Sequence, residues 1–211
     1  VAMLKCHASC EDENSFITHI ESSKLSENNT MLSSTEIFDA QRCQTILHFK
    51  LISQQVLPHL LFATGVVTYI RTLLKMNWNG FKSIDRTGIL EQQLRLHPNR
   101  LGITHISTLM GHGVIAFEAI AKDQAITEYL GVVSCSHKTT YKPDTSYVMS
   151  YPLPGLAGWV WSINALEEGN ISRFINHSRT PNATTRVFFD GFLLRIAVVS
   201  LKPIHAGEAI T

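Results

Sequence analysis

The sequence predicts a mostly β domain that follows a helical N-terminal region. Up to Lys75 the apolar residues recur at helical intervals. Beyond residues 77–80 the apolar runs become shorter and are separated by Gly, Pro, Asn and Asp, as in strands and turns. With 211 residues and 45% hydrophobic content, the chain is long enough to form a globular core. We expect a mobile polar arm (1–34), a helical region (35–80), a connector (81–99) and the β domain (100–211).

The helical region is predicted to hold two helices. The first has an N-cap at Ser34 or Thr35 and ends before Pro58, which cannot continue it. The second spans about 59–75, and its apolar stretch at 60–70 is too short to cross a bilayer, so no membrane partner is expected. The apolar positions of the first helix are Ile37, Phe38, Ile46, Leu47, Phe49, Leu51 and Ile52. Strands are predicted at 103–109, 125–133, 147–151, 158–163 and 192–199.

Composition excludes little and points to an intracellular setting. The 18 basic and 17 acidic side chains nearly cancel, so no nucleic-acid partner is demanded. Residues 71–110 hold six basic and two acidic groups, an excess that a solvated helix face explains better than a binding patch. The four cysteines lack a disulfide or zinc spacing, and no secretion signal is recognised. No metal is predicted, since unpaired thiols explain Cys6 and Cys10 better than zinc ligation with His7 and His19.

Three motifs carry the candidate chemistry. Residues 169–178, Gly-Asn-Ile-Ser-Arg-Phe-Ile-Asn-His-Ser, set small, amide, guanidinium and imidazole groups around an apolar pair, which suits a buried polar site better than a surface loop. Together with Gly-His-Gly-Val at 111–114 and Glu-Tyr-Leu-Gly at 128–131, this stretch resembles the signature of SET-domain protein lysine methyltransferases. The resemblance covers roughly residues 100–211. It implies small curved sheets and a C-terminal pseudoknot, in which the last segment passes through a loop beside the Asn-His-Ser stretch.

The resemblance also implies S-adenosylmethionine as cofactor. Glycines in the first motif would let main-chain groups approach this ligand without a Cβ in the way. Asn176 would bond the amino-acid part of the cofactor, His177 would present main-chain groups to the adenine edge, and Arg173 would brace the pocket. The implied cofactor residues are Met110, Gly111, His112, Gly113, Ser146, Tyr147, Arg173, Asn176 and His177.

Methyl transfer to lysine requires a neutral amine, whereas the reference pKa of lysine is about 10.4. A narrow apolar channel can desolvate the amine, and hydroxyl or carbonyl dipoles can hold it in line, so neither a metal nor a covalent nucleophile is needed. The resemblance implies that Tyr129 supplies a catalytic hydroxyl and a wall of the channel, and that Met149 also lines it.

The sequence departs from the family pattern at several positions. Arg179 stands where many members have a zinc-binding Cys, so that zinc site is not predicted. Asp123 replaces a frequent turn Gly, which a residue tolerant of left-handed backbone can do. Residues 207–211 open a Gly-Glu-x-Leu-Thr-x-x-Tyr motif, but the sequence ends before the Tyr that supplies the family's main catalytic hydroxyl. We interpret this as truncation and expect the chain as given to transfer methyl groups poorly.

The implied substrate is a lysine in a protein or peptide, with a histone tail as the first candidate. A weak nucleosomal DNA contact through residues 71–105 would accompany it. The chain would act in the nucleus or cytoplasm. A pathogen protein acting in a host nucleus fits as well, because the cysteine-rich flanks of other members are missing.

Two alternatives stay open at this stage. Gly111-x-Gly113-x-x-Ala116 also fits a dinucleotide-binding fingerprint, with Glu128 as the ribose contact, and this oxidoreductase reading requires a helix over 114–121. The other is a non-catalytic SET-like module that binds peptides or acts as a scaffold, which the missing Tyr and Met149 motivate.

Overall fold

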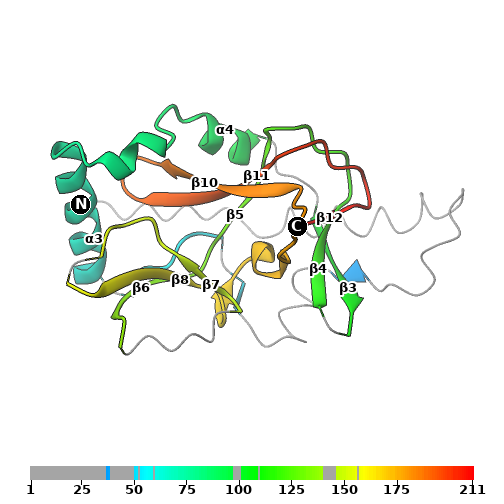
Figure 1. Cartoon of the computed structure of the whole chain (residues 1–211), viewed down its shortest axis with the longest axis horizontal. Helices are drawn as coiled ribbons and strands as arrows, with labels where there is room; N and C mark the ends of the chain where they lie inside the picture. The colour runs from blue at the N-terminus through cyan, green and yellow to red at the C-terminus, as the bar shows by residue number, and fades with distance from the viewer. Residues whose placement is uncertain are drawn as a thin grey trace, which may run out of the picture. The chain divides into compact units, whose positions relative to one another are not determined.

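The computed structural model describes residues 37–38, 50–51, 53–58, 60–96, 101–108, 110–139, 146–155 and 157–211, all within one compact unit, Glu36–Thr211 (Figure 1). Its helices are α3 (Leu60–Lys75), α4 (Ile89–Leu96) and the 3₁₀ helices η1 (Asn79–Ser83) and η2 (Ile171–Phe174). Its strands are β1 (Ile37–Phe38), β2 (Lys50–Leu51), β3 (Leu101–Ser107), β4 (Gly111–Ala116), β5 (Ala125–Glu128), β6 (Val132–His137), β7 (Val148–Ser150), β8 (Trp159–Asn164), β9 (Glu168–Gly169), β10 (Ala183–Phe189), β11 (Leu194–Ser200) and β12 (Ala209–Ile210).

The second predicted helix is confirmed by α3. Val66, Ile70 and Leu73 recur at helical spacing, are buried, and pack in one cluster with Val133 of β6 and Ile163 of β8. This packing orients the sheet that carries β6 and β8. Among the described residues, none of the helices has the length and apolar content needed to cross a membrane.

The first predicted helix is wrong where the structure describes it. Ile37–Phe38 pairs as β1 with β3, and Lys50–Leu51 pairs as β2 with β9. The Lys50 N–H also donates to the Glu167 carbonyl at 2.6 Å. Pairing with strands far along the chain therefore overrides the helical spacing of the apolar residues. The predicted polar arm (1–34) lies outside the described residues.

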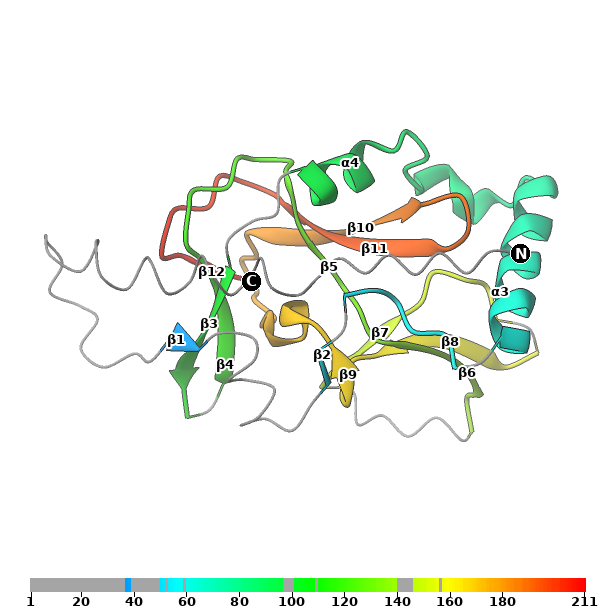
Figure 2. The ribbon, with the colours of Figure 1, turned by 180° about the vertical axis from the view of Figure 1, so that it is seen from behind.

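The described strands form four small sheets, in the orders β1–β3–β4–β12, β10–β11–β5, β6–β8–β7 and β2–β9. Figure 2 shows the parallel pair β2 and β9 side by side, and all other neighbouring strands are antiparallel. The mostly β prediction is confirmed, because the predicted strands correspond to β3, β5 with β6, β7, β8 and β11. No strand was predicted at β4, β9, β10 or β12.

The C-terminal segment is hydrogen-bonded to Asn182 and Ala183, shortly after the Asn-His-Ser stretch, and Figure 1 shows the C-terminus beside β12. β12 runs antiparallel to β4. The buried Asn182 donates from Nδ2 to the Ala209 carbonyl at 2.7 Å and to Glu208 Oε1 at 3.1 Å, and its Oδ1 accepts from the Thr211 N–H at 2.9 Å. Ile210, 1% exposed, belongs to the same core cluster as Val198 of β11. These contacts fix the last residues against the region that carries the candidate site.

Candidate active site

The short helix η2 connects the candidate site residues. Asn170 fixes its start, because the Asn170 Nδ2 donates to the Glu128 carbonyl at 2.9 Å and the Asn170 Oδ1 accepts from Ser172 Oγ at 2.5 Å. Ser172, Arg173 and Phe174 of η2 are all buried. The helix is thereby attached to the end of β5, immediately before Tyr129.

The predicted cofactor glycines meet Asn176. The Asn176 Nδ2 donates to the His112 carbonyl in β4 at 2.9 Å. A Cβ built on Gly113 would lie 3.0 Å from that same Nδ2 and 2.6 Å from Cγ1 of Ile106. Gly113 therefore allows Asn176 to approach β4, and Gly111, with a φ of 67°, takes a conformation that favours glycine. Asn176 therefore contacts His112 and Gly113, although it follows them by more than 60 positions in the sequence. We call this region the Gly113–Asn176 surface.

His112 lies between this surface and η2. Its ring is 6.3 Å from the Phe174 ring and 5.8 Å from the His105 ring, edge-on in both cases. Burial, together with the neighbouring His105, lowers the pKa of His112 below its ordinary value. The imidazole is therefore neutral at physiological pH, which suits contact with an uncharged aromatic group.

Tyr129 is buried at the end of β5, and its hydroxyl donates to the Tyr147 carbonyl at 2.8 Å. Burial raises the pKa of Tyr129 to about 12, against the opposing charge of Arg173. The guanidinium carbon of Arg173 lies 4.2 Å from the centre of the Tyr147 ring. The Tyr129 phenol is therefore protonated and oriented. Tyr147 is contacted at its carbonyl by Tyr129 and at its ring by Arg173.

A pocket of about 120 Å³ contains both predicted channel residues, Tyr129 and Met149. Its walls also include Ser172 and Ile175, from η2 and its C-cap, and Thr211 at the C-terminal end. The lining is largely apolar, and Ser172, Thr184, Thr185 and Thr211 contribute hydroxyl groups to it, which suits a channel for an alkyl amine.

Three predicted cofactor residues lie more openly. Met110 is 46% exposed, and Ser146 and His177 are exposed as well. The structure thus brings Gly111, His112, Gly113 and Asn176 together, and it brings Tyr129, Tyr147, Met149 and Arg173 together.

The sequence does not predict the ion pair between the buried Glu128, next to Tyr129, and the partly buried Arg195. Arg195 donates from Nε to Glu128 Oε1 at 2.7 Å and from Nη2 to Glu128 Oε2, and its Nη1 lies 3.5 Å from Asp190. Burial raises the pKa of Glu128 while Arg195 opposes the rise. Burial also acts against the charge of Arg195, but the Glu128 contacts outweigh it and raise the pKa of Arg195. No local signal could have revealed a pair separated by 67 positions.

The dinucleotide-binding alternative is contradicted. Residues 111–116 form β4, antiparallel to β3 and β12, so the helix required over 114–121 is absent from this fully described range. The Glu128 carboxylate is committed to Arg195 rather than exposed for a ribose contact. Strand pairing on both edges of β4 excludes the phosphate-binding helix that the fingerprint needs.

The expected backbone at Asp123 is confirmed, since its φ is 61°. Within the part of the chain that the structure describes, no group of His, Cys, Asp or Glu is arranged to hold a metal ion. The cysteine and histidine positions considered for zinc near the N-terminus, Cys6, His7, Cys10 and His19, lie outside the described residues.

Comparisons with known proteins agree with this geometry. Residues 111–211 match the family model of the SET domain, so the chain contains a SET domain over this range. The chain is 28% identical over 173 residues to histone-lysine N-methyltransferase SETD1 of Drosophila melanogaster, covering 78% of this chain and 10% of that protein. It is 33% identical over 117 residues to histone-lysine N-methyltransferase SUV39H1 of Xenopus laevis, covering 48% of this chain and 26% of that protein.

The fold resembles that of ATXR5, solved in complex with a mono-methylated histone H3.1. The TM-score is 0.62 at 18% sequence identity, covering 81% of this chain and 83% of that one. At this identity the likeness concerns the fold, and it confirms the SET fold class. The chain spans only 10% of the length of SETD1 and 26% of that of SUV39H1. The activity of those longer proteins is therefore not assigned to this chain from the similarity.

Proposed function

We propose that the chain transfers a methyl group from S-adenosylmethionine to the side-chain amine of a lysine, on a histone tail. One observation carries the proposal: η2 joins the Gly113–Asn176 surface to the pocket that holds Tyr129 and Met149. The names of the relatives, histone-lysine N-methyltransferases, support the same reaction and substrate class.

The residues at the Gly113–Asn176 surface fit the proposed cofactor. Asn176 donates one amide proton to the His112 carbonyl. Its second amide proton can donate to the carboxylate of the ligand, and its amide oxygen can accept from the amino group. The neutral His112 ring offers an aromatic edge for the adenine. When bound, S-adenosylmethionine supplies a sulfonium methyl whose bond to sulfur breaks as the amine nitrogen forms its bond to carbon, with the electron pair left on sulfur.

The proposed channel prepares the lysine for this displacement. Apolar walls desolvate the ammonium, and the nearby Arg173 cation disfavours a second positive charge, so both effects lower the lysine pKa and release its proton to solvent. The Tyr129 hydroxyl points its proton at the Tyr147 carbonyl, so its oxygen is free to accept from the neutral amine. The lone pair of that amine is thereby aimed along the channel.

The exposed residues complete the proposed cofactor site at its rim. Met110, Ser146 and His177 would close over the ligand from outside, which their exposure permits. A histone substrate would place the chain on chromatin in the nucleus, where a weak DNA contact through residues 71–105 would accompany catalysis.

Methyl transfer can be tested with isotopically labelled S-adenosylmethionine and mixed histones, using a chain extended beyond Thr211 by the Tyr that the motif calls for. The expected result is labelled histone lysine, with loss of label in Tyr129→Phe because that variant lacks the oriented hydroxyl. Tight cofactor binding without any labelled product would instead favour a scaffold that retains the SET shape.

A further inference from the structure

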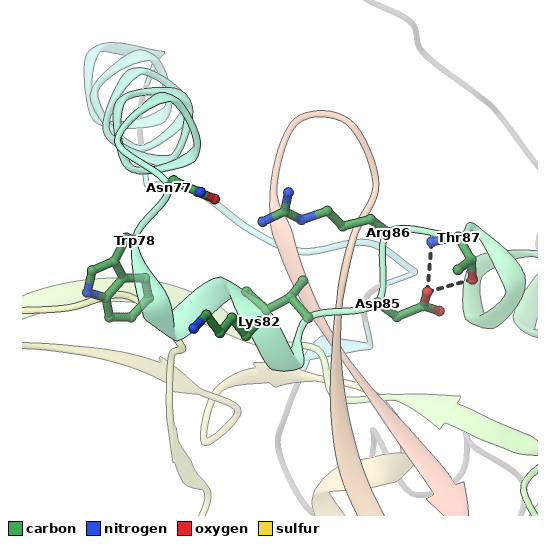
Figure 3. Close-up of a pocket in the computed structure, with 7 residues that line it drawn as sticks. Asn77, Trp78, Lys82, Asp85, Arg86 and Thr87 are labelled. Atoms are coloured by element: carbon green, nitrogen blue, oxygen red, sulfur yellow. Dashed lines mark hydrogen bonds between the residues drawn. The ribbon is translucent and has the colours of Figure 1, made fainter.

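A second pocket, of about 450 Å³, lies outside the candidate active site (Figure 3). It is formed where α3 ends, along η1, and in the turn that leads to α4. Lys82 and Arg86 line it together with Asn77 and Trp78. In Figure 3 the Arg86 guanidinium and the Asn77 amide point toward each other across the opening, and the Lys82 amine extends toward the Trp78 indole.

One wall of this pocket is fixed by the end of α3. The N–H groups of Asn77 and Trp78 donate to the carbonyls of Leu74 and Leu73, each at 3.2 Å, and Asn77 has a φ of 52°. This pattern is a helix C-cap of the Schellman type. The Trp78 indole lies over Gly80, where a Cβ would come within 2.0 Å of the ring. The backbone at Asn77 and the flat ring of Trp78 are therefore held in place before any ligand arrives.

The opposite wall is fixed by Asp85. Its Oδ1 accepts from the N–H and the hydroxyl of Thr87, at 2.8 and 2.6 Å, and its Oδ2 accepts from the Leu90 N–H at 3.3 Å. In Figure 3 the Asp85 carboxylate points toward Thr87, on the side away from Asn77. Asp85 is the sole acid among the lining residues, and these bonds turn its charge toward the start of α4 rather than into the opening.

The surroundings add to the positive charge. Lys82 and Arg86 are exposed, and Arg71 and Lys75, also exposed, lie one turn apart on the last turns of α3, which lead to Asn77. These side chains do not line the channel pocket, whose walls come from other elements. A basic histone tail would be repelled here, whereas an anion would be attracted.

We infer that this pocket, which lies outside the proposed histone-lysine site, binds a phosphate of the DNA backbone. Lysine and arginine supply the charged donors that phosphate oxygens prefer, and the Asn77 amide adds a neutral donor. The Trp78 ring offers an apolar face for the adjoining sugar. The choice of duplex DNA rests on the proposed function, because a histone tail on chromatin lies beside duplex DNA. Of the basic residues at 71–110, Arg71, Lys75 and Arg95 are exposed on helices, as a solvated helix face predicts. Lys82 and Arg86 line this pocket.

The inference can be tested by fluorescence anisotropy with a short, random-sequence DNA duplex over a series of salt concentrations. We compare the wild-type chain with the double variant Lys82→Ala/Arg86→Ala and with the control Lys138→Ala/Lys202→Ala, which removes the same charge from exposed positions that do not line the pocket. The pocket variant should bind the duplex about ten-fold more weakly. The slope of log Kd against log salt should decrease by the amount that corresponds to the loss of about two phosphate contacts. The control should change little.

An equal loss of DNA affinity in both double variants, or unchanged DNA affinity in the pocket variant, would overturn the inference. Competition by polyglutamate as effective as competition by unlabelled duplex would also overturn it, in favour of an acidic peptide. Asn77→Gly keeps the left-handed backbone but removes the amide, so it should weaken binding by less than the double variant, with unchanged thermal melting. Methyl transfer to a free histone peptide is measured on the same variants, each prepared in the chain extended beyond Thr211 that the transfer assay uses. Transfer without pocket-dependent DNA binding rejects this inference alone, whereas DNA binding without transfer rejects the proposed function.

Discussion

The two sides of the candidate site are built differently. On the channel side, Tyr129 is held by its N–H bond to the Ile196 carbonyl at 2.8 Å and follows the buried Glu128–Arg195 pair. On the cofactor side, the hydrogen bond from Asn176 to the His112 carbonyl joins a loop to a strand, and the exposed His177 and Met110 flank it. The proposed channel residue Tyr129 is thus anchored in the core, whereas the residues proposed to flank the cofactor are exposed. Substitutions on the two sides should therefore have separable effects.

The largest effect is expected from Arg195→Met on the channel side. Removing one partner leaves the Glu128 carboxylate buried without its cation, which typically costs about 3–5 kcal/mol of unfolding free energy. Urea denaturation measures the loss. The double variant Glu128→Gln/Arg195→Met serves as the control, because it also removes the Glu128 charge, leaves only Asp190 without its cation, and should recover part of the stability. A single variant as stable as the wild type would contradict the importance of the pair.

The next effect concerns Gly113→Ala on the cofactor side. The added Cβ would meet Ile106 at 2.6 Å and the Asn176 amide at 3.0 Å, so we expect Asn176 to be displaced and cofactor affinity to fall by about ten-fold, with a stability cost of about 1–3 kcal/mol. Calorimetric titration with S-adenosylmethionine measures the affinity. Gly65→Ala in α3 is the matched control, since no atom lies within 4 Å of its Cβ and alanine favours the helix. Undiminished affinity in Gly113→Ala would show that close packing at this glycine does not matter.

The sequence predicted the mostly β fold class and the three motifs of the candidate site, because both can be recognised from short patterns of residues. Gly111, Gly113, Tyr129 and Asn176 were singled out because they lie in short motifs that resemble the SET signature. The Glu128–Arg195 pair was not, because it depends on the register in which β5 and β11 align. The first helix failed for the same reason, since β1 and β2 owe their conformation to partner strands that local periodicity does not encode. The roles of Asn170 and Asn182 as braces likewise depend on tertiary contacts.

A smaller effect is expected from acidification, at the C-terminal segment that closes the channel. The Glu208 carboxylate accepts from the His205 N–H at 2.9 Å and from Asn182, and these bonds lower its pKa from the ordinary value of 4.5. A carboxyl whose folded pKa is lowered contributes stability above its unfolded pKa, and this contribution is lost as the pH falls through the folded value. The melting temperature should therefore decrease as the pH falls from about 5 to about 3, and it should decrease less in Glu208→Gln. Identical drops in both proteins would exclude Glu208 as a source.

The smallest effect is the expected absence of a Tyr129 titration. Its pKa of about 12 keeps the phenol protonated throughout the range in which a protein substrate can be assayed. The transfer rate should rise with pH as the substrate lysine loses its proton, because its reference pKa is about 10.4. Initial rates on a histone peptide, measured as a function of pH, test this expectation. A decline of the wild-type rate as the pH rises through neutrality would contradict this expectation and show that Tyr129 titrates far below its expected pKa.

The central claim is that Asn176 and the glycines of β4 hold the cofactor while Tyr129 acts on the amine. Calorimetric titration of S-adenosylmethionine into wild type, Asn176→Ala and Tyr129→Phe tests it most directly. We predict that Asn176→Ala binds the cofactor about ten-fold more weakly or worse, because it loses both the ligand contact and the bond to His112. Tyr129→Phe should bind it as wild type does. Equal affinity in wild type and Asn176→Ala would contradict the placement of the cofactor site.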